Sequence, residues 1–172
     1  ELAHPSEDAT LTLFTDASKL HWSSFLGQVV DYRKDVKIED QLIEPLYFLS
    51  GGFKGAQLKW SIVEKEGYAF FISVERLQHL LVRAKGFVVF TDHNNLRFIY
   101  GDTRSTQLNV RARLDRWALR LQRYRFDIVH ISGETNVWAD IKSRWGAAHT
   151  TEEGIVVKRS IRAVAKERVR HK

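Results

Sequence analysis

The sequence of 172 residues contains no cysteine, no methionine and two prolines. The absence of cysteine excludes disulfide scaffolds, thiol nucleophiles and zinc sites built on thiolates. No apolar run approaches the roughly 18 residues of a membrane-spanning helix, so we expect no membrane association. The first residues, 1–8, are polar and acidic and are unlike a secretory signal. Because the chain lacks an initiating methionine, we expect it to be a piece of a longer polypeptide.

The composition that is present fits one globular domain, with 44% apolar and 28% charged residues. The net charge of +6 points weakly to a polyanionic partner. Residues 158–172 carry seven cations and one anion, so the rest of the chain is neutral overall. We expect an N-terminal arm over 1–8, a folded domain over 9–148 and a basic C-terminal tail over 149–172. A linker is favoured for this tail over a segment that binds nucleic acid without specificity.

The hydrophobic pattern predicts a mixed α/β domain with a single five-stranded sheet. Three strands follow one another through polar connections, which favours an antiparallel meander, and the later strands alternate with helices. The expected strands are 11–14, 22–30, 46–49, 87–90 and 126–131, and the expected helices are 61–84, 95–100, 108–124 and 136–145. The strand 87–90 is uniformly apolar, so we expect it to be buried on both faces.

Two of the expected strands end in the same way, with a threonine and an aspartate after a hydrophobic run. They read Leu13-Phe14-Thr15-Asp16 and Val89-Phe90-Thr91-Asp92. One aspartate in such a place commonly begins a turn. Two of them in one sheet could bring both carboxylates to the same edge.

The long helix that starts after Ser61 offers two further carboxylates. Ser61 and Glu64 have the spacing of a capping box, which gives Glu64 a structural role. Glu66 instead falls within the apolar stripe, where a carboxylate is costly unless a cation meets it. A pairing of Glu66 with a core arginine is the alternative. Asp140 lies early in the last expected helix, where the helix dipole alone would favour an anion.

Four carboxylates at one edge would require cations. Two carboxylates about 4 Å apart repel by about 4 kcal/mol at an effective dielectric constant near 20. Oxygen ligands without cysteine suit Mg²⁺ or Mn²⁺. Two such ions about 4 Å apart form the usual two-metal site for phosphoryl displacement.

At this point the sequence resembles the ribonuclease H domain of gypsy-type (Metaviridae) LTR-retrotransposon reverse transcriptases. The resemblance covers residues 9–146 and rests on short motifs in the family's order. They are Thr15-Asp16-Ala17-Ser18, Glu64-Lys65-Glu66, Thr91-Asp92-His93-Asn94-Asn95-Leu96, and Asn136-Val137-Trp138-Ala139-Asp140 followed by Ser143-Arg144. The resemblance implies the ribonuclease H-like fold and two Mg²⁺ or Mn²⁺ ions held by catalytic acids, namely Asp16, Glu66, Asp92 and Asp140. Gly67 departs from the family, which usually has a bulkier helix former there.

The resemblance also implies an activity and partners. Such domains cut the RNA strand of an RNA/DNA hybrid during reverse transcription and leave a 3′-hydroxyl and a 5′-phosphate. The partners would be the hybrid and the polymerase domain of the same polyprotein, in the cytoplasm and within a virus-like particle. Two alternatives are a non-catalytic, connection-type module that binds nucleic acid and a related nuclease acting on DNA. The intact acidic set and the ordered motifs favour the ribonuclease.

Several further residues are candidates for supporting roles. His130, about ten positions before Asp140, is a candidate auxiliary proton donor, and the alternative is a strand-end histidine facing water. His93 is expected to support Asp92. The helix 108–124 has an apolar stripe beside a ridge of arginines, which favours phosphate contact over a solvated charged face. The residues assigned to substrate binding are Ser18, Asn94, Asn95, Arg113, Arg116, Arg120, Arg123 and Arg144.

Overall fold

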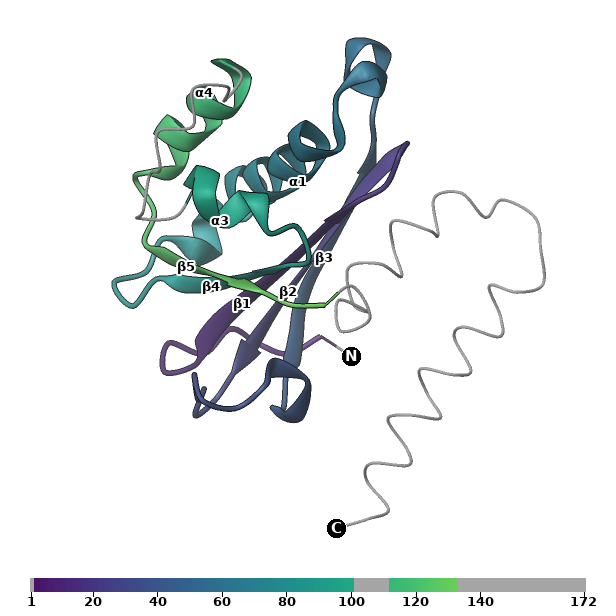
Figure 1. Cartoon of the computed structure of the whole chain (residues 1–172). Coiled ribbons are helices and arrows are strands. Elements are labelled where there is room, and N and C mark those ends of the chain that lie inside the picture. The colour runs from purple at the N-terminus through teal and green to yellow at the C-terminus, as the bar shows by residue number, and fades with distance from the viewer. Residues whose placement is uncertain (1, 101–111, 133–172) are drawn as a thin grey trace, which may run out of the picture.

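The computed structural model describes residues 2–100 and 112–132, which form a twisted sheet covered by helices on one side (Figure 1). The strand order is β3-β2-β1-β4-β5. The first three strands pair antiparallel, β4 lies parallel to β1, and β5 lies parallel to β4. This arrangement confirms the five-stranded mixed sheet expected from the sequence. The strands are β1 (Thr10–Ala17), β2 (His21–Val29), β3 (Glu44–Gly52), β4 (Phe87–Thr91) and β5 (Phe126–His130).

The helices largely follow the expected periodicity. They are α1 (Ile62–Arg76), α2 (Gln78–Leu81), α3 (Asn95–Tyr100) and α4 (Ala112–Leu121), with 3₁₀ turns η1 (Ile38–Asp40) and η2 (Gly55–Lys59). The single helix expected over 61–84 is wrong, because Leu77 leaves the helical conformation and separates α1 from α2. The helix expected over 136–145 and the tail 149–172 lie outside the described residues. In the part of the chain that is described, every helix is too short or too polar to cross a bilayer.

The capping box at the start of α1 is present as the sequence predicts. Ser61 Oγ accepts a hydrogen bond from the Glu64 N–H at 3.4 Å, and Glu64 Oε2 accepts one from the Ser61 N–H at 2.9 Å. These bonds satisfy two of the donors that a helix N-terminus leaves open. They also fix which residues of α1 face the sheet.

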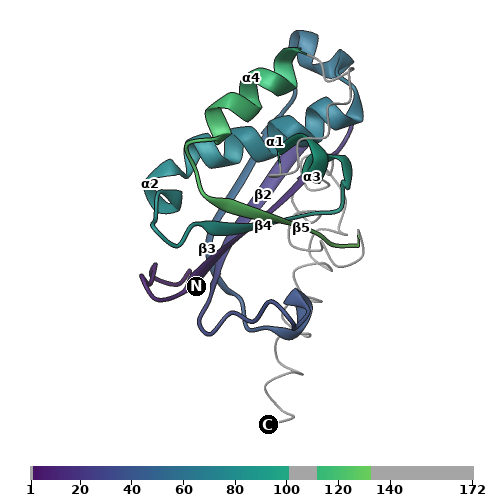
Figure 2. The same ribbon diagram turned by 60° about the vertical axis from the view of Figure 1, so that its left-hand side comes forward.

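The core of the described residues has one main cluster on each face of the sheet and a smaller third cluster that includes Trp22 of β2 and Ala69 of α1. Residues of α1, α3 and α4 pack on one face, and η1 with its flanking residues packs on the other (Figure 2). In β4, Phe87 and Val89 point to the helices, whereas Val88 and Phe90 point to the opposite face. The expectation that this strand is buried on both faces is therefore confirmed.

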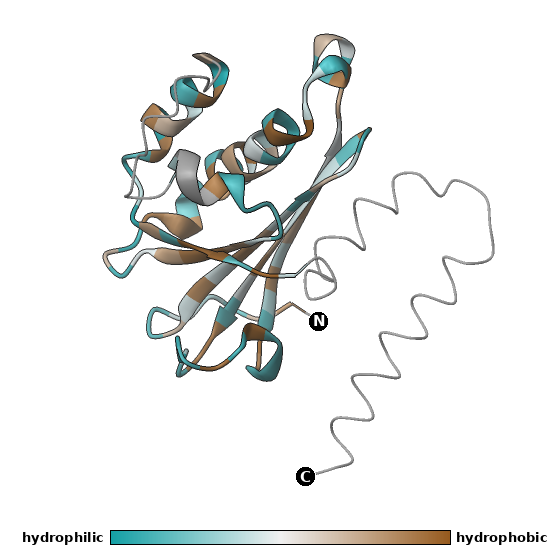
Figure 3. Ribbon diagram, in the orientation of Figure 1, coloured by the Kyte–Doolittle hydropathy of each residue, from teal (hydrophilic) through white to brown (hydrophobic). Residues whose placement is uncertain are grey.

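A glycine in the middle of α1 allows the helices to pack closely. A Cβ atom on Gly67 would lie 2.8 Å from Leu114 Cδ2 and 2.9 Å from Tyr100 Oη. A side chain would fit here only if the ends of the Leu114 and Tyr100 side chains moved. This close contact favours glycine despite its low helix propensity. The apolar stripe of α4 meets this surface with Leu114, Trp117 and Leu121 buried. Its other side is polar, and brown and teal alternate around α4 in Figure 3.

Two local expectations about burial and strand length are wrong. The hydrophobic periodicity over 61–84 predicts Ile62 on the apolar face of that helix, but Ile62 is 51% exposed. The third strand was expected to close before Gly51-Gly52, but β3 includes both glycines. A Cβ on Gly51 would lie 2.8 Å from the indole nitrogen of Trp22 on the neighbouring strand. This glycine therefore makes room for a cross-strand tryptophan.

The residues before β1 lie against the sheet. The Ala3 N–H donates to the Pro45 carbonyl at 2.7 Å. The buried side chain of Gln28 accepts from the Ser6 N–H at 2.8 Å and donates to the His4 carbonyl at 2.9 Å. The segment expected to be an arm is thus hydrogen-bonded to β2 and β3.

Candidate metal centre

Three carboxylates from three different elements meet at one edge of the sheet. Strands β1 and β4 are parallel neighbours with Phe14 opposite Phe90, and Asp16 and Asp92 each lie two residues further along. Glu66 reaches the same place from α1. Asp16, Glu66 and Asp92 each offer a carboxylate oxygen, and these oxygens all lie within 4.8 Å of one another. The structure therefore brings together three of the four acids that the sequence singled out, and Asp140 lies outside the described residues.

Glu66 is the buried member of this cluster. It is 3% exposed, and its Oε1 accepts a hydrogen bond from the Ala17 N–H at 3.1 Å. Its Oε2 is buried and has no hydrogen-bond partner among the described residues. Burial, followed by the negative charges of Asp16 and Asp92, raises the pKa of Glu66 well above its usual value, against the lowering effect of the Ala17 N–H. A bound cation would oppose this shift, because it stabilises the charged form of the carboxyl.

The alternative of a core arginine paired with Glu66 is not what the structure shows, because the arginine that reaches this turn of α1 pairs with Glu64. Arg113 of α4 donates from Nη1 to Glu64 Oε1 at 2.6 Å, and the Glu64 side chain is 2% exposed. The guanidinium also lies 4.5 Å from the ring centroid of Trp60. Sequence reasoning missed this contact because the two residues are 49 positions apart and belong to different helices.

Acids of α1 oppose the arginine ridge that was predicted from the sequence. Glu75 of α1 accepts from both Arg120 and Arg123, the latter at 3.4 Å. Arg116 donates to the Ala112 carbonyl at 3.3 Å and forms no recorded ion pair within the described residues. Arg113 and Arg120 of α4, and Arg123 just after it, therefore pair with α1, and contact of the ridge with phosphate stays a prediction.

The substrate-binding residues expected after β1 and β4 are close in sequence to Asp16 and Asp92. Their hydrogen bonds and their exposure to solvent differ. The Ser18 hydroxyl accepts from the His21 N–H and donates to the His21 carbonyl, both at 3.0 Å, so it shapes the turn between β1 and β2. Asn94 and Asn95 are exposed, and Asn95 is the first residue of α3. Arg144 lies outside the described residues.

The two histidines near Asp92 differ in exposure. His130 is exposed at the end of β5, and its Nε2 lies 3.0 Å from the Asp92 carbonyl oxygen. The pKa of His93 is lowered by burial, with the negative charge of Asp92 acting in the opposite direction. Its Nδ1 is buried without a hydrogen-bond partner in the described part of the chain. Both rings thus border the acidic cluster.

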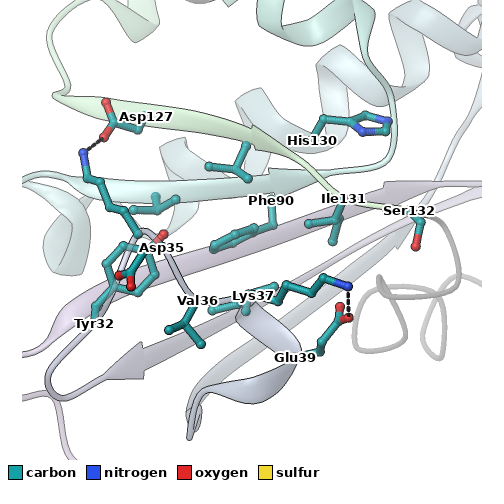
Figure 4. A pocket seen from close by; sticks show the side chains of 14 residues that line it. Tyr32, Asp35, Val36, Lys37, Glu39, Phe90, Asp127, His130, Ile131 and Ser132 are labelled. Atoms are coloured by element: carbon teal, nitrogen blue, oxygen red, sulfur yellow. Dashed lines mark hydrogen bonds and ion pairs between the residues drawn. The ribbon is translucent and has the colours of Figure 1, made fainter.

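The opposite face of the sheet contains a separate pocket of about 540 Å³. It lies between residues 32–39 and the strands β4 and β5 (Figure 4). His130 and Ser132 border one end, and the other end holds Asp127, whose carboxylate pairs with Lys34 Nζ at 2.9 Å. The floor is apolar and includes Phe90. His130 is the residue that this pocket shares with the surroundings of the acidic cluster.

Comparison with solved structures identifies the fold. The dRH form of the foamy viral protease–reverse transcriptase in complex with double-stranded DNA matches with a TM-score of 0.55 and 13% identity, over 76% of this chain and 22% of that chain. LC11-RNase H1 bound to an RNA/DNA hybrid matches with a TM-score of 0.50 and 19% identity, over 76% of this chain and 91% of that one. The sheet with its carboxylates at the ends of β1 and β4 is thus part of a ribonuclease H-like domain.

Sequence comparison identifies the family. Residues 6–124 match the RNase H-like domain found in reverse transcriptase. The chain is 31% identical over 143 residues to the Pol polyprotein of transposon opus from Drosophila melanogaster, covering 83% of this chain and 13% of the polyprotein. It is 31% identical over 144 residues to the transposon Tf2-3 polyprotein of Schizosaccharomyces pombe, covering 83% of this chain and 10% of that polyprotein. The chain belongs to the family of RNase H-like domains of reverse transcriptases, and it spans a small part of these relatives.

Proposed function

We propose that the chain is a metal-dependent endoribonuclease that cuts the RNA strand of RNA/DNA hybrids during reverse transcription of a gypsy-type retrotransposon. The products would be a 3′-hydroxyl and a 5′-phosphate. The observation that carries the proposal is the cluster of Asp16, Glu66 and Asp92, with ligand oxygens within 4.8 Å of one another. The reverse-transcriptase family supports the substrate class.

The residues present fit a hard divalent cation. All three donors are carboxylate oxygens, the ligand type that Mg²⁺ and Mn²⁺ prefer. Glu66 Oε2 is buried with no hydrogen-bond partner among the described residues, so a cation would satisfy an otherwise costly group. We propose that Asp140 is a fourth ligand and that two ions bind. Bound Mg²⁺ would supply Lewis-acid charge that activates water and stabilises the leaving oxygen.

The chain's own residues would orient the substrate and handle protons. The Ala17 N–H holds Glu66 Oε1, which fixes the direction of that carboxylate. His130 is exposed beside Asp92, a position suited to delivering a proton to the leaving 3′ oxygen. Asn94 and Asn95 are exposed next to Asp92 and could bond the 2′-hydroxyl that distinguishes RNA from DNA.

The backbone of the hybrid requires cations at the surface. Arg116 is the member of the α4 ridge with no recorded ion pair within the described residues, so we propose it as a phosphate contact. Arg113, Arg120 and Arg123 would contribute only where their pairing with Glu64 and Glu75 leaves donors available. In the polyprotein the polymerase domain would deliver the hybrid, inside an intracellular virus-like particle.

The test is cleavage of a labelled RNA/DNA hybrid by the full 172-residue chain in Mg²⁺, with and without chelator. Asp92→Asn should abolish cleavage while the protein stays folded by circular dichroism. Asp127→Asn is the matched control, because Asp127 is exposed on β5 and pairs with Lys34 on the other face of the sheet. The control should cleave at the rate of the unmodified chain.

Two results would overturn the proposal. Binding of the hybrid without cleavage in any divalent cation would favour the non-catalytic module. Equal cleavage of double-stranded DNA would favour a DNA nuclease on the same fold.

A further inference from the structure

The middle residue of Glu64-Lys65-Glu66 is a buried cation that the proposed chemistry does not use. Lys65 is 4% exposed, although it lies in the first turns of α1 beside two carboxylates. Lysine is rarely buried, because removing an ammonium group from water is expensive unless hydrogen bonds replace the lost hydration. Its recorded contacts therefore indicate its role.

The ammonium group of Lys65 bonds two backbone carbonyls. Its Nζ donates to the Lys19 carbonyl at 2.6 Å and to the Leu58 carbonyl at 3.1 Å. It also lies 5.3 Å from the ring centroid of Phe53, within the range of a cation–π interaction. Lys19 belongs to the turn between β1 and β2, and Leu58 belongs to η2. One side chain thus ties α1 to two separate segments.

The turn that Lys65 holds is the one that follows Asp16. Glu66 accepts a hydrogen bond from Ala17 at the start of this turn, and Lys65 donates to Lys19 two residues later. Between them the Ser18 hydroxyl closes the turn onto His21. Two consecutive residues of α1 therefore hold the end of β1 from both sides of Ser18.

This double attachment acts on the two carboxylates that must converge. Asp16 comes from β1 and Glu66 from α1, and in the absence of a cation their negative charges repel each other. A metal centre needs its ligands held in position by surrounding contacts. A bond from α1 to the turn opposes the separation of these two elements without neutralising either carboxylate.

We propose that Lys65 is a positioning residue that fixes the β1–β2 turn against α1 and so sets the affinity of the Asp16–Glu66 pair for a divalent cation. The inference rests on the proposed function, since it assigns the cluster to metal binding. It adds a structural role for a residue that contacts neither the proposed ligands nor the substrate through its recorded bonds.

The absence of cysteine makes a clean test possible. Lys65→Cys would be unfolded and alkylated with 2-bromoethylamine, which rebuilds an ammonium group on a side chain of lysine length, and then refolded. A second sample would receive a propyl group from 1-iodopropane, which has the same length but no charge. Both samples undergo the same treatment, so a difference between them reports the ammonium group.

The main measurement is Mn²⁺ binding by the protein alone, followed by electron paramagnetic resonance. We expect the propyl sample to bind about tenfold more weakly and the aminoethyl sample to return close to the unmodified chain. In hybrid cleavage, the propyl sample should need more Mg²⁺ for half-maximal rate and approach the normal rate at saturation. Lys85→Met, which removes an exposed ammonium group in the turn before β4, should change neither quantity.

Three outcomes would overturn the inference. Equal Mn²⁺ affinity of the propyl and aminoethyl samples would assign Lys65 to general stability alone. Failure of the aminoethyl sample to recover would exclude the ammonium group as the cause. A chain that binds no Mn²⁺ at all would remove the metal centre itself. Mn²⁺ binding without hybrid cleavage would contradict the proposed function. The Mn²⁺ affinities of the propyl and aminoethyl samples would still decide the role of Lys65.

Discussion

Glu64 and Glu66 are two residues apart in one helix turn, both are buried, and their surroundings are opposite. Glu64 receives a guanidinium from Arg113 and two donors from Ser61. Glu66 receives one backbone N–H and faces the negative charges of Asp16 and Asp92. The Glu64 carboxylate therefore stabilises the metal-free fold as an anion. The Glu66 carboxylate is instead held in place against repulsion from Asp16 and Asp92.

The pKa of Glu66 sets how the metal-free protein responds to pH. The folded protein raises the pKa of Glu66, so protonated Glu66 favours the folded state. This contribution to the free energy of unfolding is complete below the unfolded pKa near 4.3 and is lost as the pH rises through the folded pKa. Glu66→Gln cannot ionise, and we expect it to be about 1–2 kcal/mol more stable than the unmodified chain at pH 8 in chelator. Urea unfolding between pH 4.5 and pH 8 should show this advantage shrinking towards low pH.

Glu64→Gln provides the matched control for this measurement. The same substitution two residues away removes the anion that pairs with Arg113 and caps the helix, so it should destabilise the protein at pH 8. If both variants shift stability in the same direction, the contrast between the two carboxylates is incorrect.

At the scale of elements, the contact between α1 and α4 combines close packing with ion pairs. Gly67 lets Leu114 approach the helix backbone, and Glu64 and Glu75 anchor the arginines of α4 at two levels along α1. A side chain at Gly67 would meet atoms of two elements at once. The position of α4 on α1 is therefore specified by shape in the middle and by charge on either side.

We expect Gly67→Ala to destabilise the protein by about 1–3 kcal/mol, although alanine is the better helix former. The new methyl group would lie 2.8 Å from Leu114 Cδ2, so either α4 or its side chain must move. Thermal unfolding measures the change. A gain in stability would mean that α4 shifts without cost and that the close contact does not position it.

We expect Arg113→Met to destabilise the fold by about 2–3 kcal/mol, because it leaves the buried Glu64 carboxylate without its cation. Arg116→Met is the control on the same helix, since Arg116 is exposed and has no recorded ion pair within the described residues. It should change stability by less than about 0.5 kcal/mol. Denaturant unfolding compares the two, and equal effects would refute a specific role for the Glu64 pair.

Much of this arrangement could be predicted from sequence where the signal is local. The repeated Thr-Asp after a hydrophobic run predicted that Asp16 and Asp92 share an edge, and the capping box separated Glu64 from Glu66. The partners of the arginines could not be predicted, because they depend on which helix faces α4. The double attachment of the β1–β2 turn was also hidden, since a lysine that bonds carbonyls leaves no complementary charge in the sequence.

For the whole molecule, metal binding and folding should be linked. A cation that binds the folded chain and not the unfolded one adds about 2.7 kcal/mol at 100 times its dissociation constant. We therefore expect the melting temperature to rise from chelator to saturating Mg²⁺ or Mn²⁺, and this rise to be largely lost in Asp92→Asn. Differential scanning calorimetry measures both. An equal rise in the variant would place the stabilising ion elsewhere.

The parallel pairing of β1 and β4 also determines where the chain tolerates changes in length. Asp16 and Asp92 face each other through a fixed ladder register, and successive residues of a strand point to opposite faces. One residue inserted between Phe14 and Asp16 would move the aspartate out of register with Asp92 and turn its side chain to the other face of the sheet. An insertion among the exposed residues 34–35, between β2 and β3, lengthens a surface connection and leaves that register unchanged. Among related transposon sequences, insertions and deletions compatible with function should therefore accumulate in this connection. They should be absent from β1 and β4.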